Sequence, residues 1–438
     1  MISVNVNLQS SFIFALGFAV IFGFKTDYVL TALYFLLFIL AFSGPMKTLL
    51  FFLVCAIVNI LNIDILQVPI IKVEPILQML VCMFCMFYLY VSKNININKF
   101  VAIFFIIFAF YLFVHSILIS GMPILSLLKS ISFVFIASTI YLSYCSLDQK
   151  DKRIFLGILF WALFLLTLVS FSGFVIGFGY EVNGTGFQGI LNHPQTMGVY
   201  SGALFMFCCY LISLNREFYG NLIISFLAFL ALILVFASQS RTGLLMIIIP
   251  ACIAMIYYSK LLFNNFTFLI STIIFVLLTF LLINIYLDEF ILYLVKGSGS
   301  DNFTDIAMSS RGPLFLAMWN NIISNPILGI GFGVPTDNIF FNFEDASSFA
   351  GIIISYPIEK GILFFALLEE LGLIGFFLFI ILLTVVVYFP LKTNVLGAML
   401  GISILSSNIT EATFMSFGGA GLILFIFFTV GVMSLRKN

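Results

Sequence analysis

The sequence has 438 residues, of which 63% are hydrophobic and only 8% are charged. Soluble domains carry about 25% charged residues, and a soluble fold could not remove this much apolar surface from water. The composition excludes a cytosolic enzyme, a nucleic-acid-binding protein and a disordered chain. It predicts an all-α polytopic integral membrane protein. Eighteen basic and eighteen acidic residues cancel, so the net charge says nothing about partners.

Apolar segments long enough to span a bilayer recur along the whole chain. A spanning helix needs about 20 mostly apolar residues, and on this criterion we expect about 12–14 transmembrane helices. The candidate spans are 10–24, 28–44, 48–63, 75–92, 100–119, 124–145, 154–178, 199–214, 219–238, 242–259, 267–287, 362–389, 393–412 and 419–435.

The spans divide the chain into four predicted blocks. N-terminal transmembrane helices occupy 1–178. Central transmembrane helices occupy 179–287, with a short extramembrane loop at 179–198. One large extramembrane loop occupies 288–361, and C-terminal transmembrane helices occupy 362–438.

The lysines and arginines of the short loops predict the orientation, because these residues are enriched in cytoplasmic loops. Threading the spans with Arg436 and Lys437 in the cytoplasm places eleven basic residues in inside loops and four in short outside segments. The opposite threading inverts this ratio. We therefore predict that both termini are cytoplasmic and that 179–198 and 288–361 lie outside.

The large outer loop contains a predicted helix of its own. Residues 311–324 have apolar positions at helical spacing, and Ser310 is a possible N-cap. The Pro- and Gly-rich stretch NPILGIGFG follows directly. A loop of this length with an amphipathic helix favours a functional role, and the alternative is an extramembrane insertion without function.

Polar clusters at the outer ends of the predicted spans are the candidate site, because charged side chains near spans are energetically costly. Arginine presents a planar fork of donors that matches phosphate oxygens, so Arg241 and Arg311 at one membrane face suit a lipid-linked diphosphate. Neighbouring carboxylates suit sugar hydroxyls or a general base. The alternative for Arg241 is an interfacial residue that extends its charge to water. The clusters are Asn192–Gln195, Ser238–Gly243, Ser309–Arg311, Glu359–Lys360 with Glu369–Glu370, and Ser406–Glu411.

Metal and nucleotide chemistry find no support in the sequence. The two histidines lie far apart: His115 is expected to be a hydrogen-bonded helix-packing residue, whereas His193 lies in an Asn-His-Pro turn and is the better site candidate. The sequence contains no Asp-x-Asp pair, no P-loop and no Gly-rich dinucleotide turn. The seven cysteines all lie in apolar runs, which disfavours a disulfide framework. We therefore expect neither a metal nor a cofactor.

Four stretches that contain these clusters follow one another along the chain: NHPQTMG (192–198), SQSRTGLL (238–245), SSRGPLFLAMWNNIISNPILGIGFG (309–333) and EKGILFFALLEELGLIG (359–375). Together with one long loop between two late spans, they resemble the superfamily of bacterial O-antigen polymerases and O-antigen ligases. The resemblance covers roughly residues 185–415 and implies a membrane-embedded (GT-C-like), metal-independent glycosyltransferase of the bacterial inner membrane. Its implied donor is a glycan on undecaprenyl diphosphate, and the large loop is then periplasmic.

The resemblance implies that Arg241 and Arg311 hold the donor diphosphate. Ligases of this family carry a histidine just before the Glu-x-Gly-x-x-Gly span, and this place here reads Glu359-Lys360-Gly361. The departure favours a polymerase, whose acceptor is a sugar hydroxyl of another lipid-linked repeat unit. A chain-length regulator is a possible partner. The further candidate substrate-binding residues are Lys360, Glu370, His193, Asn192 and Gln239.

Glu359 is the first candidate for the general base that activates the acceptor hydroxyl. In an uninterrupted helix Glu370 would lie about 16 Å deeper, which suits structural or donor-orienting work better than contact with a glycan. Glu370 and His193 are the fallback candidates. The alternative for Glu359 is a structural pairing with Lys360 or Arg311.

Two other functions stay open at this point. One is an O-antigen ligase that transfers the glycan to a lipid acceptor. The other is a flippase or transporter of lipid-linked oligosaccharide, which should carry ionisable residues along a path through several spans. The charges of this sequence gather instead at one predicted face, which favours chemistry at that face.

Overall fold

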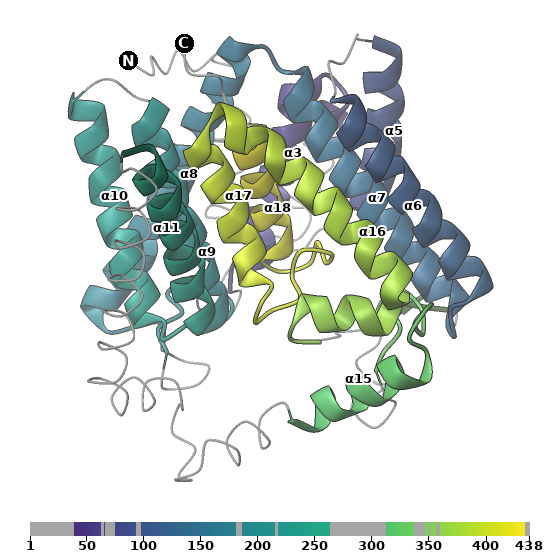
Figure 1. Ribbon diagram of the computed structural model, residues 1–438. Helices are drawn as coiled ribbons and strands as arrows, with labels where there is room; N and C mark the ends of the chain where they lie inside the picture. Colours follow the sequence, from purple (N-terminus) through teal and green to yellow (C-terminus); the bar gives the residue numbers. More distant parts are fainter. Residues whose placement is uncertain are drawn as a thin grey trace.

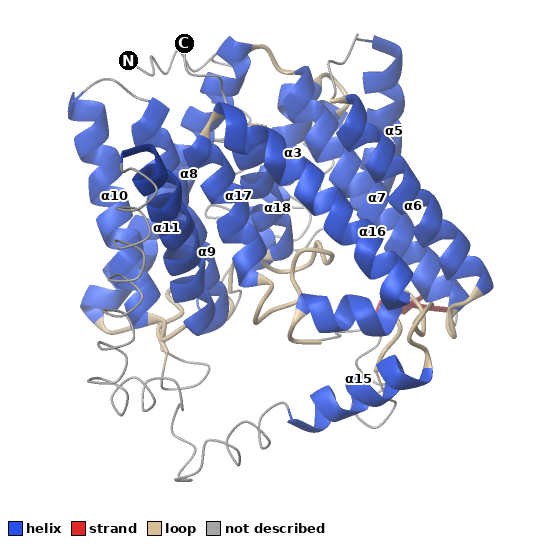
Figure 2. Ribbon diagram, in the orientation of Figure 1, coloured by secondary structure: helices blue, strands red, loops and turns tan. Residues whose placement is uncertain are grey.

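The computed structural model describes residues 39–62, 65, 75–92, 98–180, 186–214, 218–262, 312–336, 347–349, 352–355 and 360–433. This part of the chain is nearly all helical (Figure 2), and its helices pack side by side into one bundle (Figure 1). The predicted spans at 10–24 and 267–287, and residues 28–38 of the span at 28–44, lie outside the described residues. Arg311 and Glu359 lie outside them too.

The other predicted spans are confirmed as helices, in place and in order. The helix predicted at 311–324 is also present, as α15. The helices are α3 (Pro45–Ile60), α5 (Pro75–Ser92), α6 (Lys99–Leu118), α7 (Pro123–Ser146), α8 (Gln149–Ile176), α9 (Pro194–Leu214), α10 (Phe218–Ala237), α11 (Arg241–Leu262), α15 (Gly312–Ser324), α16 (Leu363–Thr393), α17 (Val395–Ser407) and α18 (Gly421–Val432). A short antiparallel hairpin joins β1 (Ser347–Phe349) to β2 (Ile352–Ser355).

Six of the described helices are long and apolar enough to cross a membrane. They are α6, α7, α8, α9, most of α10 and most of α16, and the shorter apolar helices α3, α11, α17 and α18 pack among them. This architecture is that of an all-α, multi-pass membrane protein.

Consecutive helices run in opposite directions, so their loops alternate between the two ends of the bundle. The C-terminal ends of α6, α8 and α10 lie at the same end as the N-terminal ends of α7, α9 and α11 (Figure 1). The helix α15 lies beyond this end, which we call the α15 end. All the predicted polar clusters that the structure describes therefore lie at the α15 end.

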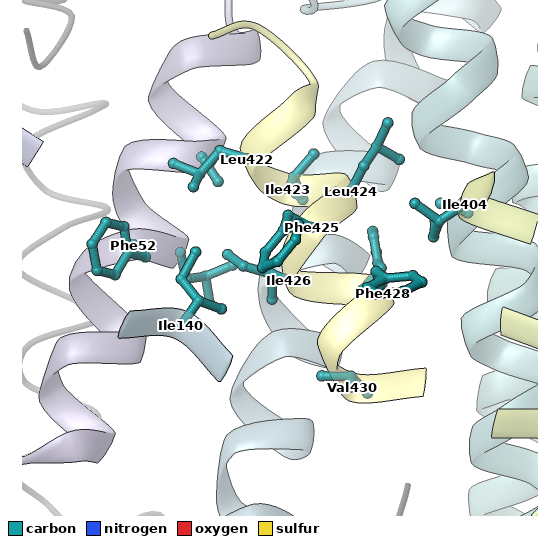
Figure 3. Packing of buried hydrophobic residues seen from close by; sticks show 14 of the residues in the cluster. Phe52, Ile140, Ile404, Leu422, Ile423, Leu424, Phe425, Ile426, Phe428 and Val430 are labelled. Atoms are coloured by element: carbon teal, nitrogen blue, oxygen red, sulfur yellow. The ribbon is translucent and has the colours of Figure 1, made fainter. Parts of the chain in front are cut away.

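The centre of the bundle is the short helix α18. All twelve of its residues are buried, as expected for a helix that is apolar on every side. It contacts α3, α7, α9 and α17. Figure 3 shows its side chains between Phe52 of α3, Ile140 of α7 and Ile404 of α17.

The helix α16 is broken at Gly372, whose φ of 64° and ψ of −170° are not helical. A Cβ at this position would lie 2.3 Å from the carbonyl oxygen of Ile327, so only glycine fits. The piece before the break runs across the α15 end, and the piece after it runs through the bundle (Figure 1). The span predicted at 362–389 is therefore present but broken, and Glu370 lies in the piece before the break.

Candidate functional site

The break in α16 is filled by the 325–336 segment, the Pro- and Gly-rich stretch that follows α15. A broken helix leaves carbonyl and N–H groups without partners, and these are costly to bury inside a membrane protein. The segment supplies the missing partners through its own backbone. The four bonds are Ile330 N–H to Glu369 O (2.9 Å), Gly331 N–H to Glu370 O (2.9 Å), Leu373 N–H to Pro326 O (2.9 Å) and Ile374 N–H to Ile327 O (3.3 Å).

Helix α6 and the turn that follows it hold the same junction from the other side. The Tyr111 hydroxyl donates to the Leu371 carbonyl oxygen at 2.7 Å, and Nε2 of His115 lies 2.5 Å from the Leu328 carbonyl oxygen. The Gly121 N–H donates to the Ile330 carbonyl oxygen at 3.1 Å. His115 is therefore the hydrogen-bonded packing residue that the sequence predicted, although its partner is a loop backbone.

Four charged side chains meet beside this junction, and we call them the charge cluster: Lys129 of α7, Lys360, Glu369 and Glu370. The Lys360 ammonium bridges both carboxylates, at 2.8 Å from Glu369 Oε2 and 3.0 Å from Glu370 Oε1. The Lys129 ammonium lies 3.3 Å from Glu370 Oε2. Two positive and two negative charges make the cluster neutral.

Every carboxylate oxygen of the cluster has a partner. Beside the lysines, Glu369 accepts from Asn321 Nδ2 at 2.7 Å and from Thr336 Oγ1 at 3.1 Å. Glu370 Oε2 accepts from the Gly333 N–H at 2.6 Å. Buried charges require such pairing, because removing an unpaired ion from water costs about 5 kcal/mol. The carboxylates therefore join α15, the 325–336 segment and α16 into one unit.

The members of the cluster differ in exposure. Glu369 is fully buried, and Lys360 and Glu370 are each only 3% exposed. The Lys129 side chain is 31% exposed, and its ammonium lies 4.5 Å from the centre of the Phe332 ring. Lys129 was not among the predicted site residues. The available signal was a lysine inside an apolar predicted span.

A second polar corner lies where α9 and α11 begin. Arg241 is the first residue of α11 and is exposed. Before it, Gln239 has a φ of 52°, the positive-φ conformation that favours glycine, while Ser238 and Ser240 are buried. Gln239 is the one non-glycine residue of the described part with a positive φ.

Asn192 and His193 precede α9 at this same corner, and both are partly buried. The Nδ1 of His193 accepts from the Gln195 N–H at 3.1 Å. The loop that leads to them is tied to the end of α10, because the Phe187 N–H donates to the Ala237 carbonyl oxygen at 3.0 Å. A Cβ at Gly186 would lie 2.8 Å from the Ser238 carbonyl oxygen. The predicted residues of the α9 and α11 starts therefore lie in one corner.

Close packing of α9 against α11 holds this corner in place. We call Gly198 and Gly202 of α9, with Gly243 of α11, the glycine seam. A Cβ at Gly243 would lie 2.5 Å from the Gly198 carbonyl oxygen, and one at Gly202 would lie 2.8 Å from the Gly243 carbonyl oxygen. The backbones of the two helices are thus in direct contact.

The turn after α17 links the corner to the charge cluster. The hydroxyl groups of Thr410 and Thr242 are 2.5 Å apart, which joins the turn to the first residues of α11. The carbonyl oxygen of Asn408 accepts from the Leu363 N–H at 3.0 Å, which joins the same turn to the start of α16. The buried Asn408 side chain shapes the turn, since its Oδ1 accepts from two backbone N–H groups, those of Thr413 and Phe414. The corner and the cluster therefore belong to one wall at the α15 end.

Residues Arg311 and Glu359 flank described parts of this wall. Arg311 immediately precedes α15, and Glu359 immediately precedes Lys360. Within the described residues, no group of three His, Cys, Asp or Glu side chains could hold a metal ion. The described part of this wall presents the exposed Arg241 together with the partly buried Asn192 and His193.

Residues 226–380 match the family model described as O-Antigen ligase. The match runs from α10 to α16 and includes Gln239, Arg241 and three members of the charge cluster. Comparison with curated proteins gives no significant match. This match supports a relationship to the O-antigen ligase and O-antigen polymerase superfamily, whose members are membrane enzymes that transfer glycosyl groups.

Proposed function

We propose that this protein polymerises undecaprenyl-diphosphate-linked oligosaccharide repeat units into a surface polysaccharide, either O-antigen or capsule. One lipid-linked chain is the donor and another is the acceptor, and glycosyl transfer takes place without a metal at the periplasmic face of the bacterial inner membrane. The observation that carries the proposal is the single wall at the α15 end. It combines the polar corner, where Arg241 is exposed, with the neutral charge cluster, which anchors the 325–336 segment.

In this proposal Arg241 binds the donor diphosphate together with Arg311. Arg241 stands at the N-terminus of α11, where the helix dipole also favours an anion. The carboxylates of the charge cluster are matched by two lysines, so no uncompensated negative charge there opposes the diphosphate. Gln239, Asn192 and His193 provide hydrogen-bonding groups in the same corner.

The roles of Lys360 and Glu370 follow from their burial. Both were predicted to bind substrate, but they are 3% exposed and engaged with each other at 3.0 Å. We therefore propose that they position the neighbouring chain and do not contact sugar. The ion pairs of Lys360 fix the chain directly after Glu359, and Glu359 remains our proposed general base.

A polymerase is favoured over a ligase by the residues before α16. The place that holds a histidine in the ligases reads Glu359-Lys360-Gly361 here. A flippase is disfavoured by the distribution of charge. In the described helices, the charged residues lie near the helix ends or in the charge cluster at the α15 end, and they form no ionisable path through the middle of the bundle.

The test uses purified protein in proteoliposomes with lipid-linked repeat units. Arg241→Ala and Arg311→Ala should each lower polymer formation by about 30- to 1000-fold, because losing a charge-assisted contact to a bound anion costs about 2–5 kcal/mol. Lysine should restore activity poorly, since it lacks the planar fork. Arg153→Ala, near the start of α8 at the opposite end of the bundle, is the matched control. Near-normal polymer from both alanine variants would refute the diphosphate assignment.

The product distinguishes the two enzyme classes. A polymerase leaves its growing glycan on undecaprenyl diphosphate, whereas a ligase moves it to a different lipid. Glu359→Gln should lower the rate by about 10²–10⁴-fold without weakening donor binding, because it removes only the proton acceptor. A normal rate in this variant would transfer the assignment to His193.

The proposed orientation is tested by cysteine labelling. Ser324 is exposed in α15, and Lys150 is exposed at the opposite end of the bundle. A cysteine at Ser324 should react with a membrane-impermeant reagent in intact spheroplasts. A cysteine at Lys150 should react only after lysis. The reverse pattern would place the wall in the cytoplasm and contradict the proposed site.

A further inference from the structure

The helix α15 exposes a stripe of large apolar side chains. Leu316 is 53% exposed, Trp319 is 49% exposed and Ile323 is 60% exposed. Their spacing places them along one side of the helix, because residues three, four and seven apart share a face. In a water-soluble protein such a stripe marks a surface with a partner.

The opposite side of α15 packs against the rest of the protein. Met318 is fully buried, and Asn321 donates to Glu369. At the edge between the two sides, the rings of Phe315 and of the half-exposed Trp319 lie 6.0 Å and 6.4 Å from the ring of Phe365, in the first piece of α16. The helix is therefore held in one orientation, with its apolar stripe directed outward.

A polar flank runs beside the stripe. Asn320 and Ser324 are exposed and lie four residues apart, on the side of the stripe away from Trp319. The Ser324 hydroxyl donates to the Asn320 carbonyl oxygen at 2.8 Å. The outward surface of α15 is thus apolar on one side and polar on the other, as expected for a helix that lies between lipid and water.

The stripe continues into the lipid-facing surface of the bundle. Ile327 is 58% exposed and Leu328 is 39% exposed, and they follow Ile323 along the chain. The Ile327 carbonyl oxygen accepts from the Ile374 N–H, which joins this pair to Leu373 and Ile374, each 43% exposed on α16. The apolar side chains that α16 exposes in a bilayer contact lipid. The α15 stripe is therefore an extension of an existing lipid interface.

We infer that α15 is an interfacial helix that lies in the bilayer leaflet at the α15 end. Leu316, Trp319 and Ile323 insert among the lipid chains, while Asn320 and Ser324 face the headgroups and water. The helix is attached to the charge cluster through Asn321, so its lipid contact fixes the depth of the whole wall.

The two tryptophans of the chain make the inference testable. Trp161→Phe leaves Trp319 as the only indole. Trp319→Phe leaves Trp161, which is 41% exposed in the middle of α8 and serves as the control for a deep, lipid-facing ring. Each variant is reconstituted in vesicles whose lipids carry bromine either near the headgroup or near the chain end. Iodide in the buffer reports exposure to water.

The expected result is that shallow bromine quenches Trp319 more than deep bromine does, and that the order is reversed for Trp161. Ile323→Glu should reduce quenching of Trp319 by shallow bromine, whereas Asn320→Glu on the polar flank should leave it unchanged. Strong quenching of Trp319 by iodide with none by lipid would overturn the inference in favour of a water-facing helix. Protection from both quenchers would overturn it in favour of a protein partner that covers the stripe.

Discussion

The glycine seam and the charge cluster position neighbouring parts of the same wall by opposite means. At the seam, α9 and α11 approach until a Cβ at Gly243 would lie 2.5 Å from the Gly198 carbonyl oxygen. Close backbone packing places the corner, and Arg241 remains exposed. In the charge cluster, Lys360 forms ion pairs with both glutamates, and Glu370 also accepts a backbone hydrogen bond. A charged residue near the membrane face is therefore a candidate ligand only when its partners leave it accessible.

The largest expected effect comes from breaking the charge cluster. Lys360→Met leaves two buried carboxylates with too little positive charge, and losing one partner of a buried ion pair costs about 3–5 kcal/mol. Thermal unfolding in detergent measures the loss, with Lys150→Met at an exposed position as the control. Adding Glu369→Gln to Lys360→Met should restore about 1 kcal/mol or more of the free energy of unfolding, because it removes one of the unpaired buried charges. If Lys360→Met is as stable as the control, the cluster does not anchor the wall.

Widening the glycine seam should have an intermediate effect. Gly243→Ala forces a methyl group against the Gly198 backbone, which α9 and α11 can relieve only by moving apart. Overpacking of this kind costs about 1–3 kcal/mol. Gly418→Ala is the matched control, since the nearest atom to its added Cβ would be the Ser416 hydroxyl oxygen at 3.9 Å. Equal melting temperatures for the two variants would show that the seam tolerates separation.

The smallest effect on stability is expected at Gln239, where the backbone has a φ of 52°. Glycine removes the steric strain of this conformation but adds freedom to the unfolded chain, so Gln239→Gly should change the free energy of unfolding by only about 0–1 kcal/mol. Its polymerisation rate should nevertheless fall, because the amide is lost from the arginine corner. Gln239→Asn retains an amide and tolerates the same backbone, so it should keep more activity than glycine does. Full activity of Gln239→Gly would limit Gln239 to a role in the turn.

The spans and the shared location of the polar clusters could be predicted from the sequence. Whether a segment crosses a membrane depends on its own length and apolarity, which are local properties. Alternating antiparallel spans then bring every second loop to the same end, so the corner with Asn192, His193, Gln239 and Arg241 follows from the order of the spans. The amphipathic spacing of 311–324 likewise predicted α15.

Only the tertiary structure decided which charges pair and where α16 breaks. Lys129 and Glu370 are separated by 241 residues, and no local sequence pattern predicts that they pair. The break at Gly372 depends on the 325–336 segment, whose backbone satisfies the groups that the break exposes. The apolar run from 362 to 389 predicted a single helix, and Glu370 was predicted to bind substrate. The sequence determined which segments enter the membrane, because apolarity acts locally, whereas the accessibility of a charge depends on partners that folding alone brings together.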